Sequence, residues 1–149
     1  MSGLIRVVLH INFHTRDDLP WITLEREAEL VPFVAKLLQG VDCKLIQGGA
    51  ASNHIHLLLE MSPALSIQEL VRRIKGASSH WIHRRWPELK EEGWQNGYAV
   101  HSVHPDGWDT VARYIQRQRE HHGKAGLGEA SGVLPHRGDA SQSLDEAVD

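Results

Sequence analysis

Two histidines, His54 and His56, lie one residue apart in the stretch SNHIHLLLE. The aliphatic run that follows them predicts a β-strand, in which alternate side chains point to the same face. The two imidazoles would then stand about 7 Å apart at their Cα atoms and could converge on one divalent ion. The alternative is that both histidines simply lie on a solvent-facing strand and bind nothing.

A tyrosine and a glutamine, Tyr114 and Gln118, lie four residues apart in RYIQRQREHH (113–122). On a helix, this spacing places both side chains on one face. The amide oxygen of Gln118 is a hard ligand, and the Tyr114 phenol is a nucleophile that a cation-stabilised phosphate could accept. A half-buried tyrosine on an amphipathic helix would give the same pattern without chemistry, so the pair gains meaning only beside a metal.

Strands and helices alternate along the chain and must position these residues. We predict helices over 23–40 and 66–86, and a last helix from Asp106 or Asp109 to about His122. We predict strands over 4–13, 41–49, 52–61 and 97–103, with a turn around Gly48, Gly49 and Ala50. This order indicates an α+β fold of the split β-α-β-β-α-β type (ferredoxin-like or RRM-like). Its antiparallel sheet has helices on one face, and a further C-terminal helix carries the tyrosine.

Local features refine these elements. Ser66 and Glu69 form a capping box at the start of the second helix. Pro32 is expected to kink the first helix or to set its true start, and Gly76 to mark a close approach by backbone or ligand. The predicted apolar stripe of the first helix consists of Leu24, Ala28, Val31, Ala35 and Leu38.

Length and composition are those of one globular domain. The chain has 149 residues, of which 41% are hydrophobic. Residues 1–122 form the predicted domain, and 123–149 a flexible or peripheral tail without clear periodicity. The sequence shows neither a signal peptide nor an apolar run long enough to cross a bilayer, so we expect no membrane association. The single cysteine, Cys43, fits a reducing cytoplasm.

The charge is unevenly distributed, although the net charge is only −3. The tail carries that excess, and a window without acids lies in the second predicted helix. A second basic cluster consists of Arg113, Arg117 and Arg119. The residues whose type and position suit contacts to nucleic-acid phosphates are Arg72, Arg73, Lys75, Ser78, Ser79, Arg84, Arg85 and Arg117. Trp81, Trp86 and Trp94 are candidates for stacking on bases, with burial in the core as the alternative.

In combination, these stretches resemble the small single-strand DNA transposases of bacterial insertion sequences, the single-tyrosine HUH transposases of the insertion sequence 200/605 group. The resemblance covers nearly all of residues 4–122. It includes HINFHTRDDLPWI, NHIHLLLEMSPALSIQELVRRIKGASSHWI, GWQNGYAVHSV and YIQRQREHH. One departure is Asn53, since many members have an aspartate before the first histidine.

The resemblance implies a mechanism for a bacterial cytoplasmic enzyme. His54, His56 and Gln118 would hold Mg²⁺ or Mn²⁺, and Tyr114 would attack the scissile phosphate of single-stranded, hairpin-bearing DNA. The products would be a 5′-phosphotyrosine and a free 3′-OH, which can rejoin strands without an energy cofactor. The family is dimeric, so the tyrosine could act on its own subunit or on its partner.

Three other functions remain open at the level of sequence. A domesticated relative would nick and join a host repeat rather than move an element. A non-catalytic single-strand nucleic-acid-binding protein could share the fold, although such sheets usually display aromatic side chains where this chain has His54 and His56. A metal-dependent hydrolase would activate water instead and leave Tyr114 with a structural role.

Overall fold

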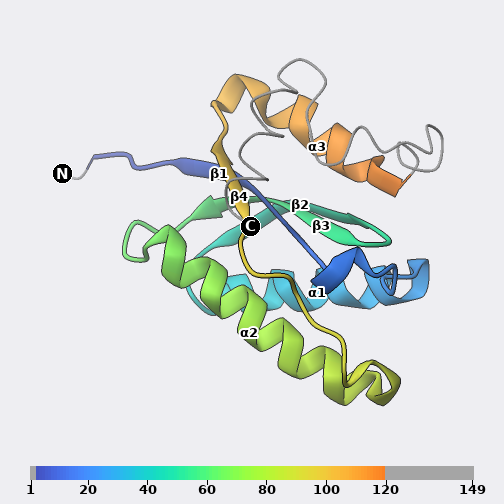
Figure 1. Cartoon of the computed structure of the whole chain (residues 1–149). Coiled ribbons are helices and arrows are strands. Elements are labelled where there is room, and N and C mark those ends of the chain that lie inside the picture. Colours follow the sequence, from blue (N-terminus) through green and yellow to red (C-terminus); the bar gives the residue numbers. More distant parts are fainter. Residues whose placement is uncertain (1–2, 120–149) are drawn as a thin grey trace.

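The computed structural model describes residues 3–119, so the predicted tail, the domain boundary at residue 122 and the expected helix end near His122 lie outside the described residues. Four antiparallel strands form one sheet in the order β2-β3-β1-β4 (Figure 1). The strands are β1 (Val7–His14), β2 (Lys44–Ala51), β3 (His54–Met61) and β4 (Ala99–Ser102). The main helices are α1 (Leu24–Gln39), α2 (Ile67–Arg85) and α3 (Trp108–Gln116).

The sheet separates two layers of helices. Helices α1 and α2 cover one face and α3 lies over the other (Figure 1). As predicted, Ile55, Leu57 and Leu59 of β3 face α1 and α2 in the main core. Leu58 points the other way and packs against α3. The α+β fold class is therefore confirmed, and the C-terminal helix covers the face that α1 and α2 leave open.

The turn between β2 and β3 lies at Ser52–Asn53, so the predicted turn around Gly48, Gly49 and Ala50 is wrong. The two glycines lie within β2, where they pair with Leu57 and His56. Glycine is uncommon inside strands, and it often marks a close approach by another part of the chain.

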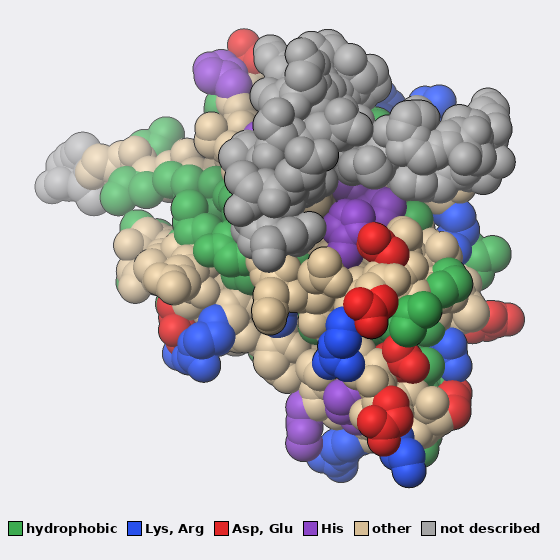
Figure 2. All heavy atoms as spheres, in the orientation of Figure 1, with side chains coloured by type: hydrophobic (Ala, Val, Ile, Leu, Met, Phe, Trp, Pro, Cys, Tyr) green, Lys and Arg blue, Asp and Glu red, His purple; other side chains and the backbone are tan. Residues whose placement is uncertain are grey.

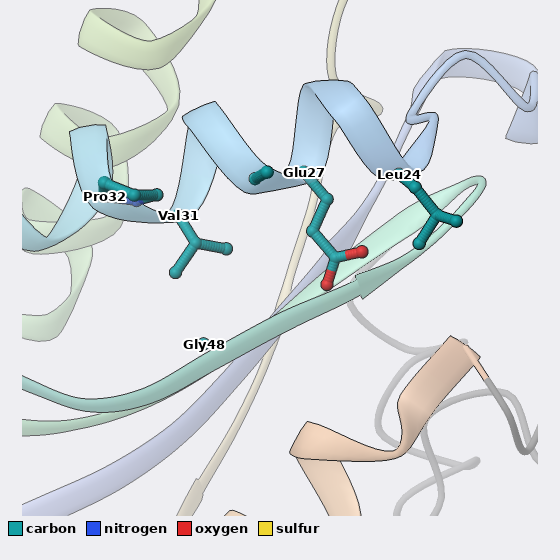
Figure 3. Close-up of a pocket in the computed structure, with 6 residues that line it drawn as sticks. Leu24, Glu27, Val31, Pro32 and Gly48 are labelled. Carbon is teal, nitrogen blue, oxygen red and sulfur yellow. The ribbon is translucent and has the colours of Figure 1, made fainter.

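Each glycine of β2 allows a helix to approach one face of the sheet. A Cβ added to Gly48 would lie 2.9 Å from Val31 Cγ1 of α1, whose position over β2 is visible in Figure 3. A Cβ on Gly49 would lie 2.5 Å from the backbone oxygen of Ile115 in α3. Because a backbone carbonyl cannot rotate away as a side chain can, Gly49 sets how closely α3 packs on the sheet.

The helix boundaries correct several predictions. The Thr23 hydroxyl accepts from the Arg26 N–H at the start of α1, and the helix continues through Pro32, which therefore does not set its start. The buried face of α1 is formed by Leu30, Val34 and Leu38, whereas Leu24 is 66% exposed. Of the predicted stripe, only Leu38 is buried.

The ends of α2 and α3 differ from the expected capping. Ser66 caps α2 by accepting from the Glu69 N–H, but the Glu69 carboxylate bonds Arg72 and Arg73 instead of returning to Ser66. At α3 the N-cap residue is Gly107, rather than Asp106 or Asp109. Within residues 3–119, no helix has the length and apolar character needed to cross a membrane.

Gly76 of α2 does not mark the predicted close approach, since a Cβ there would meet no heavy atom within 4 Å. It thus offers a matched control for Gly49. We expect Gly49→Ala to destabilise the fold and to loosen α3, because the new methyl group would collide with the Ile115 carbonyl. Gly76→Ala should stabilise the protein by up to about 1 kcal/mol through helix propensity.

Urea unfolding monitored by circular dichroism, with amide hydrogen exchange across residues 108–116, measures both effects. Equal stability of Gly49→Ala and the parent, with unchanged exchange in α3, would show that α3 does not depend on this contact.

Candidate active site

The paired histidines lie on the α3 face of β3, and both are buried, with 1% exposure for His54 and 0% for His56. Their ring centroids are 4.9 Å apart. The alternative of a solvent-facing strand is therefore wrong. Burial of two imidazoles next to each other requires polar partners, because an unpaired buried polar group is costly.

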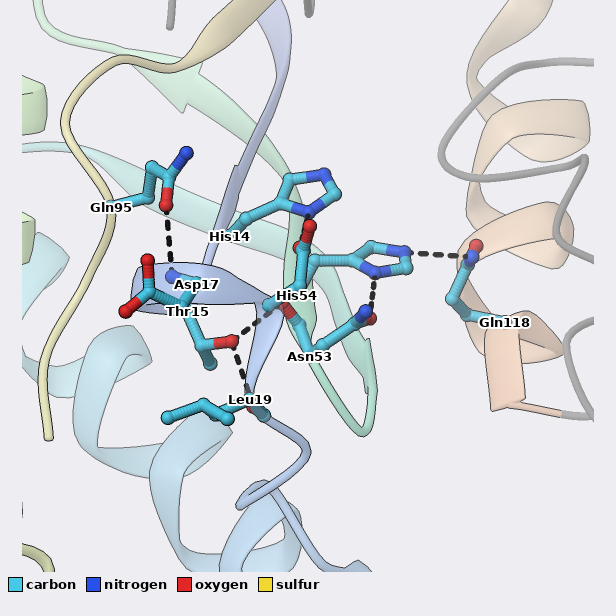
Figure 4. A network of polar contacts seen from close by, with 9 residues as sticks. His14, Thr15, Asp17, Leu19, Asn53, His54, Gln95 and Gln118 are labelled. Atoms are coloured by element: carbon cyan, nitrogen blue, oxygen red, sulfur yellow. Dashed lines mark hydrogen bonds and ion pairs between the residues drawn. The ribbon is translucent and has the colours of Figure 1, made fainter.

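Helix α3 brings Tyr114, and the segment directly after it brings Gln118, to these histidines in the same chain. The Tyr114 ring meets the His56 ring edge-on, with centroids 6.1 Å apart. Gln118 Nε2 lies 3.2 Å from His54 Nε2, as the dashed line in Figure 4 shows. Tyr114 therefore lies beside His56, and Gln118 beside His54, within a single subunit.

Packing of α3 against the sheet sets the position of Tyr114. Val111, Tyr114 and Ile115 form a small apolar cluster with Val8 of β1 and Leu58 of β3. These three α3 residues follow the helical spacing of an amphipathic face. Docking of that face directs the phenol toward the histidines.

Polar neighbours orient His54 (Figure 4). Its Nδ1 lies 2.8 Å from Asn53 Oδ1. If that oxygen accepts the Nδ1 proton, Nε2 keeps its lone pair and directs it toward Gln118. His14 of β1 stacks on the ring at 4.8 Å and lies 2.7 Å from Asp18 Oδ1 through its own Nδ1. Asn53 therefore supplies the hydrogen bond that an aspartate would supply, without the charge.

His56 has a histidine as its partner. His10 Nε2 of β1 lies 2.9 Å from His56 Nδ1, and the two rings stack with centroids 5.1 Å apart. Burial, followed by repulsion from nearby His101, lowers the pKa of His10 to about 4. Burial also lowers the pKa of His101. His10 is therefore neutral near pH 7 and can accept the Nδ1 proton of His56, which would leave the lone pair of that imidazole on Nε2.

The donor set fits a divalent cation if the amide of Gln118 takes part. Within residues 3–119, no three His, Cys, Asp or Glu side chains converge as metal ligands. Gln118 is fully buried, and its Oε1 has no hydrogen-bond partner among the described residues. A half-turn of the amide would point this oxygen at the His54 lone pair, and a cation between the two acceptors would satisfy both.

The histidines of β1 were not identified from the sequence as part of this site. His10, Asn12 and His14 alternate along β1 and lie opposite Leu58, His56 and His54 of β3, respectively. Their period of two is the signal that also marked His54 and His56, and it could have identified this second polar row. Histidine side chains reach the surface beside acidic side chains on the face shown in Figure 2.

The predicted DNA-binding window lies on α2, in the layer opposite the histidine face (Figure 1). Arg72 and Arg73 pair with Glu69. Arg85 pairs with Glu29 of α1. The side chains of all three pairs are partly exposed, and such surface pairs are weak enough for phosphates to replace them. Arg84 and Arg117 are exposed, and Ser79 is half-buried.

Two members of the window have structural contacts. The Ser78 hydroxyl is fully buried, donates to Ile74 O at 2.6 Å and accepts from Trp94 Nε1. This burial argues against the predicted phosphate contact from Ser78. Lys75 donates to the backbone oxygens of Gln95 and Gly97, both at 2.7 Å. It therefore holds the loop before β4.

The three tryptophans considered for base stacking pack within the protein. Trp86 is 9% exposed and belongs to the main core. Trp94 contacts the rings of Phe13 and Trp21. Trp81 is half-buried and stacks on Phe33, with centroids 4.5 Å apart. Core packing therefore accounts for all three positions.

Known proteins share both sequence and fold with this chain. A family described as "Transposase IS200 like" matches residues 4–118. The transposase for insertion sequence element IS200 of Salmonella typhimurium is 28% identical over 103 residues, which cover 64% of this chain and 66% of that protein. The ISDra2 transposase TnpA of Deinococcus radiodurans is 30% identical over 73 residues, covering 46% of this chain and 52% of that relative. The chain thus spans just under two thirds of the first relative's length and about half of the second's.

Solved structures show the same fold at lower sequence identity. A candidate transposase from Deinococcus radiodurans has a TM-score of 0.66 and 21% identity, covering 80% of this chain and 95% of that one. A REP-associated tyrosine transposase, bound to a REP hairpin, has a TM-score of 0.61 and 16% identity, covering 97% and 88%. The fold is therefore one that transposases use. With the match over residues 4–118, the chain belongs to the IS200-like transposase family.

The buried histidines should make stability sensitive to acid. The unfolded chain binds a proton at His10 near pH 6.5, whereas the folded chain binds it only near pH 4. Between these values the unfolded state holds more protons, so stability should fall as the pH decreases, by up to about 3 kcal/mol for this group. His101 contributes in the same direction, because burial lowers its pKa as well.

Chemical unfolding of the parent and of His10→Gln at pH 8, 6 and 4.5 measures this effect. The difference at pH 8 reports the packing cost of the substitution, and the acid slope of the variant should be shallower. An identical slope in both proteins would contradict the assignment.

Proposed function

We propose that this protein is a single-tyrosine transposase that nicks and rejoins single-stranded DNA through a 5′-phosphotyrosine intermediate. The main support for this proposal is that four side chains lie close together within one chain. Tyr114 lies against His56, and Gln118 lies against His54. In an enzyme of this class, a nucleophile and a metal site must act on the same phosphate, and the closeness of these side chains supports both roles.

The metal site would consist of His54, His56 and Gln118. A divalent cation there, Mg²⁺ or Mn²⁺, would polarise the scissile phosphate and stabilise its developing charge. Asn53 would fix the ring of His54 through Nδ1, and His10 would do the same for His56. Such outer partners hold the ligating nitrogens in place.

Tyr114 would carry the covalent step. Its oxygen forms a bond to phosphorus while the bond from phosphorus to the 3′ oxygen breaks. The phenol loses its proton and the departing 3′ oxygen gains one, so no net proton is consumed. The exchange of one phosphoester for another also explains why no energy cofactor would be needed. Attack by another 3′-OH on the phosphotyrosine reverses the step and joins strands.

The substrate would be single-stranded DNA with a hairpin, held by the cations of α2 and by Arg117. The solved relative bound to a REP hairpin supports this substrate class, and so do the exposed Arg72, Arg73 and Arg84. The active unit would be a homodimer in the bacterial cytoplasm, with residues 1–122 as the catalytic domain. The close contact of Tyr114 with its own His56 favours action within one subunit.

Tyr114→Phe tests the nucleophile. The chain has two tyrosines, so Tyr98→Phe provides a control with the same chemical change. The parent and Tyr98→Phe should form a covalent adduct with labelled hairpin DNA in Mg²⁺ or Mn²⁺, seen on a denaturing gel. Tyr114→Phe should reduce the adduct by at least about a thousandfold, because the attacking atom is gone.

The other possible functions give different results in the same assay. Cleavage without an adduct would indicate a hydrolase that activates water, and binding without cleavage a non-catalytic DNA-binding protein. An adduct that persists in Tyr114→Phe would assign the nucleophile elsewhere.

Substitution of the metal ligands should separate cleavage from binding. His54→Ala or His56→Ala should abolish cleavage while hairpin affinity stays largely intact, because the α2 cations lie on the opposite face. Gln118→Ala should weaken metal dependence more mildly and shift the Mg²⁺ titration to higher concentration. Full activity in either histidine variant would rule out this metal site, and an unchanged titration would remove Gln118 from it.

A further inference from the structure

Gln118 lies beyond the regular part of α3. The helix ends at Gln116, and Arg117 has φ −104° and ψ 19°, which is not an α-helical conformation. The expectation that one continuous helix places Tyr114 and Gln118 on a single face is therefore incomplete. Helical structure resumes at residues 118 and 119, so α3 alone does not fix the direction of the Gln118 amide, and contacts of this segment with the rest of the fold contribute.

The next residue makes such contacts. The Arg119 guanidinium donates to the backbone oxygen of Ile22 at 3.0 Å and to Glu27 Oε1 at 3.2 and 3.3 Å. The side chains of Arg119 and Glu27 are 29% and 23% exposed. Solvent and salt therefore screen this pair less than the ion pairs on the surface of α2.

Glu27 is itself fixed by the sheet. It projects from α1 toward β2 (Figure 3), and its second oxygen, Oε2, accepts the N–H of Ala50 at 2.9 Å. Ala50 precedes Ala51, which pairs with His54 across the β2–β3 ladder. The carboxylate thus joins α1, the edge strand and the segment after α3, one residue away from the position opposite His54.

We propose that Arg119 and Glu27 form a latch that positions the amide of Gln118 on His54 of the same chain. Arg119 is thereby a positioning residue rather than a member of the DNA-binding surface. The inference rests on the proposed function, in which Gln118 is a metal ligand. The latch itself is a feature of the fold and can be measured without metal or DNA.

Two separate contacts then hold the two functional residues. Docking of Val111 and Ile115 on the sheet holds the part of α3 that carries Tyr114. The latch holds the segment from Arg117 to Arg119. Loss of the latch should therefore release Gln118 while leaving the first turns of α3 in place.

Amide hydrogen exchange on the full, metal-free chain tests the latch directly. Arg119→Ala should raise exchange at residues 117–119 about tenfold and leave 109–112 unchanged. Arg113→Ala is the matched control, since it removes an exposed arginine from α3. Unchanged exchange in Arg119→Ala, or an equal rise in the control, would overturn the latch.

Manganese affinity tests whether the latch acts through Gln118. Binding is measured by electron paramagnetic resonance for the parent, Arg119→Ala, Glu27→Gln, Gln118→Ala and the double variant Arg119→Ala/Gln118→Ala. We expect Arg119→Ala to weaken Mn²⁺ binding about tenfold, as loss of an outer partner does. In the Gln118→Ala background the same change should have no further effect. An equal loss in both backgrounds would contradict action through Gln118.

The proposed metal site and the latch can be disproved independently of each other. A parent protein that binds no Mn²⁺ would overturn the proposed metal site, while the exchange result would still decide the latch. If Arg119→Ala does not fold, Arg119→Lys and Glu27→Gln take its place in both measurements. These variants keep a donor and an acceptor but lose the forked, charged contact, so both should show intermediate loss.

Discussion

The candidate site depends on how closely α3 can lie against the sheet. Tyr114 and Gln118 reach the histidines only because β2 has small residues on the α3 face. Gly49, opposite His56, has no side chain between the sheet and the Ile115 carbonyl, and Ala51, opposite His54, has only a methyl group. A larger side chain at either position would hold the helix away from both imidazoles. The small residues of the edge strand therefore determine whether the site can form.

The same contact imposes an electrostatic constraint, since it buries a row of imidazoles that must find partners among themselves. His54 uses Asn53 and Gln118, while His56 uses His10. Each of these pairs requires one donor and one acceptor. The nitrogen that carries the proton in one imidazole therefore restricts which nitrogen can carry it in the neighbouring imidazole. The hydrogen bond between His10 and His56 needs a neutral His10 if His56 is the donor, and burial favours that form by lowering the pKa of His10. In this arrangement the Nδ1 atoms of the two β3 histidines meet Asn53 and His10, and the Nε2 atom of His54 faces Gln118.

Much of this arrangement could be predicted from alternation and spacing along the chain. The period of two in β3 identified its two faces, and the resemblance of the tyrosine segment to a family placed it beside the histidines. The role of Gly48 and Gly49 could not be predicted, because glycine in a turn and glycine beneath a helix look alike in sequence. The ion pairs of Arg73 and Arg85 were missed for a related reason. An acid-free window says nothing about carboxylates just outside it, such as Glu69, or on a neighbouring helix, such as Glu29 of α1.

The basic helix α2 and the histidines lie on opposite faces of the sheet. The loop before β4 connects these two layers. Lys75 of α2 holds the backbone of this loop at Gln95, whose own N–H donates to the His14 carbonyl and whose side chain accepts from the Asp17 N–H. His14 in turn stacks on His54. Side-chain and backbone hydrogen bonds thus connect α2 with the end of β1 and β3 at which His14 and His54 lie.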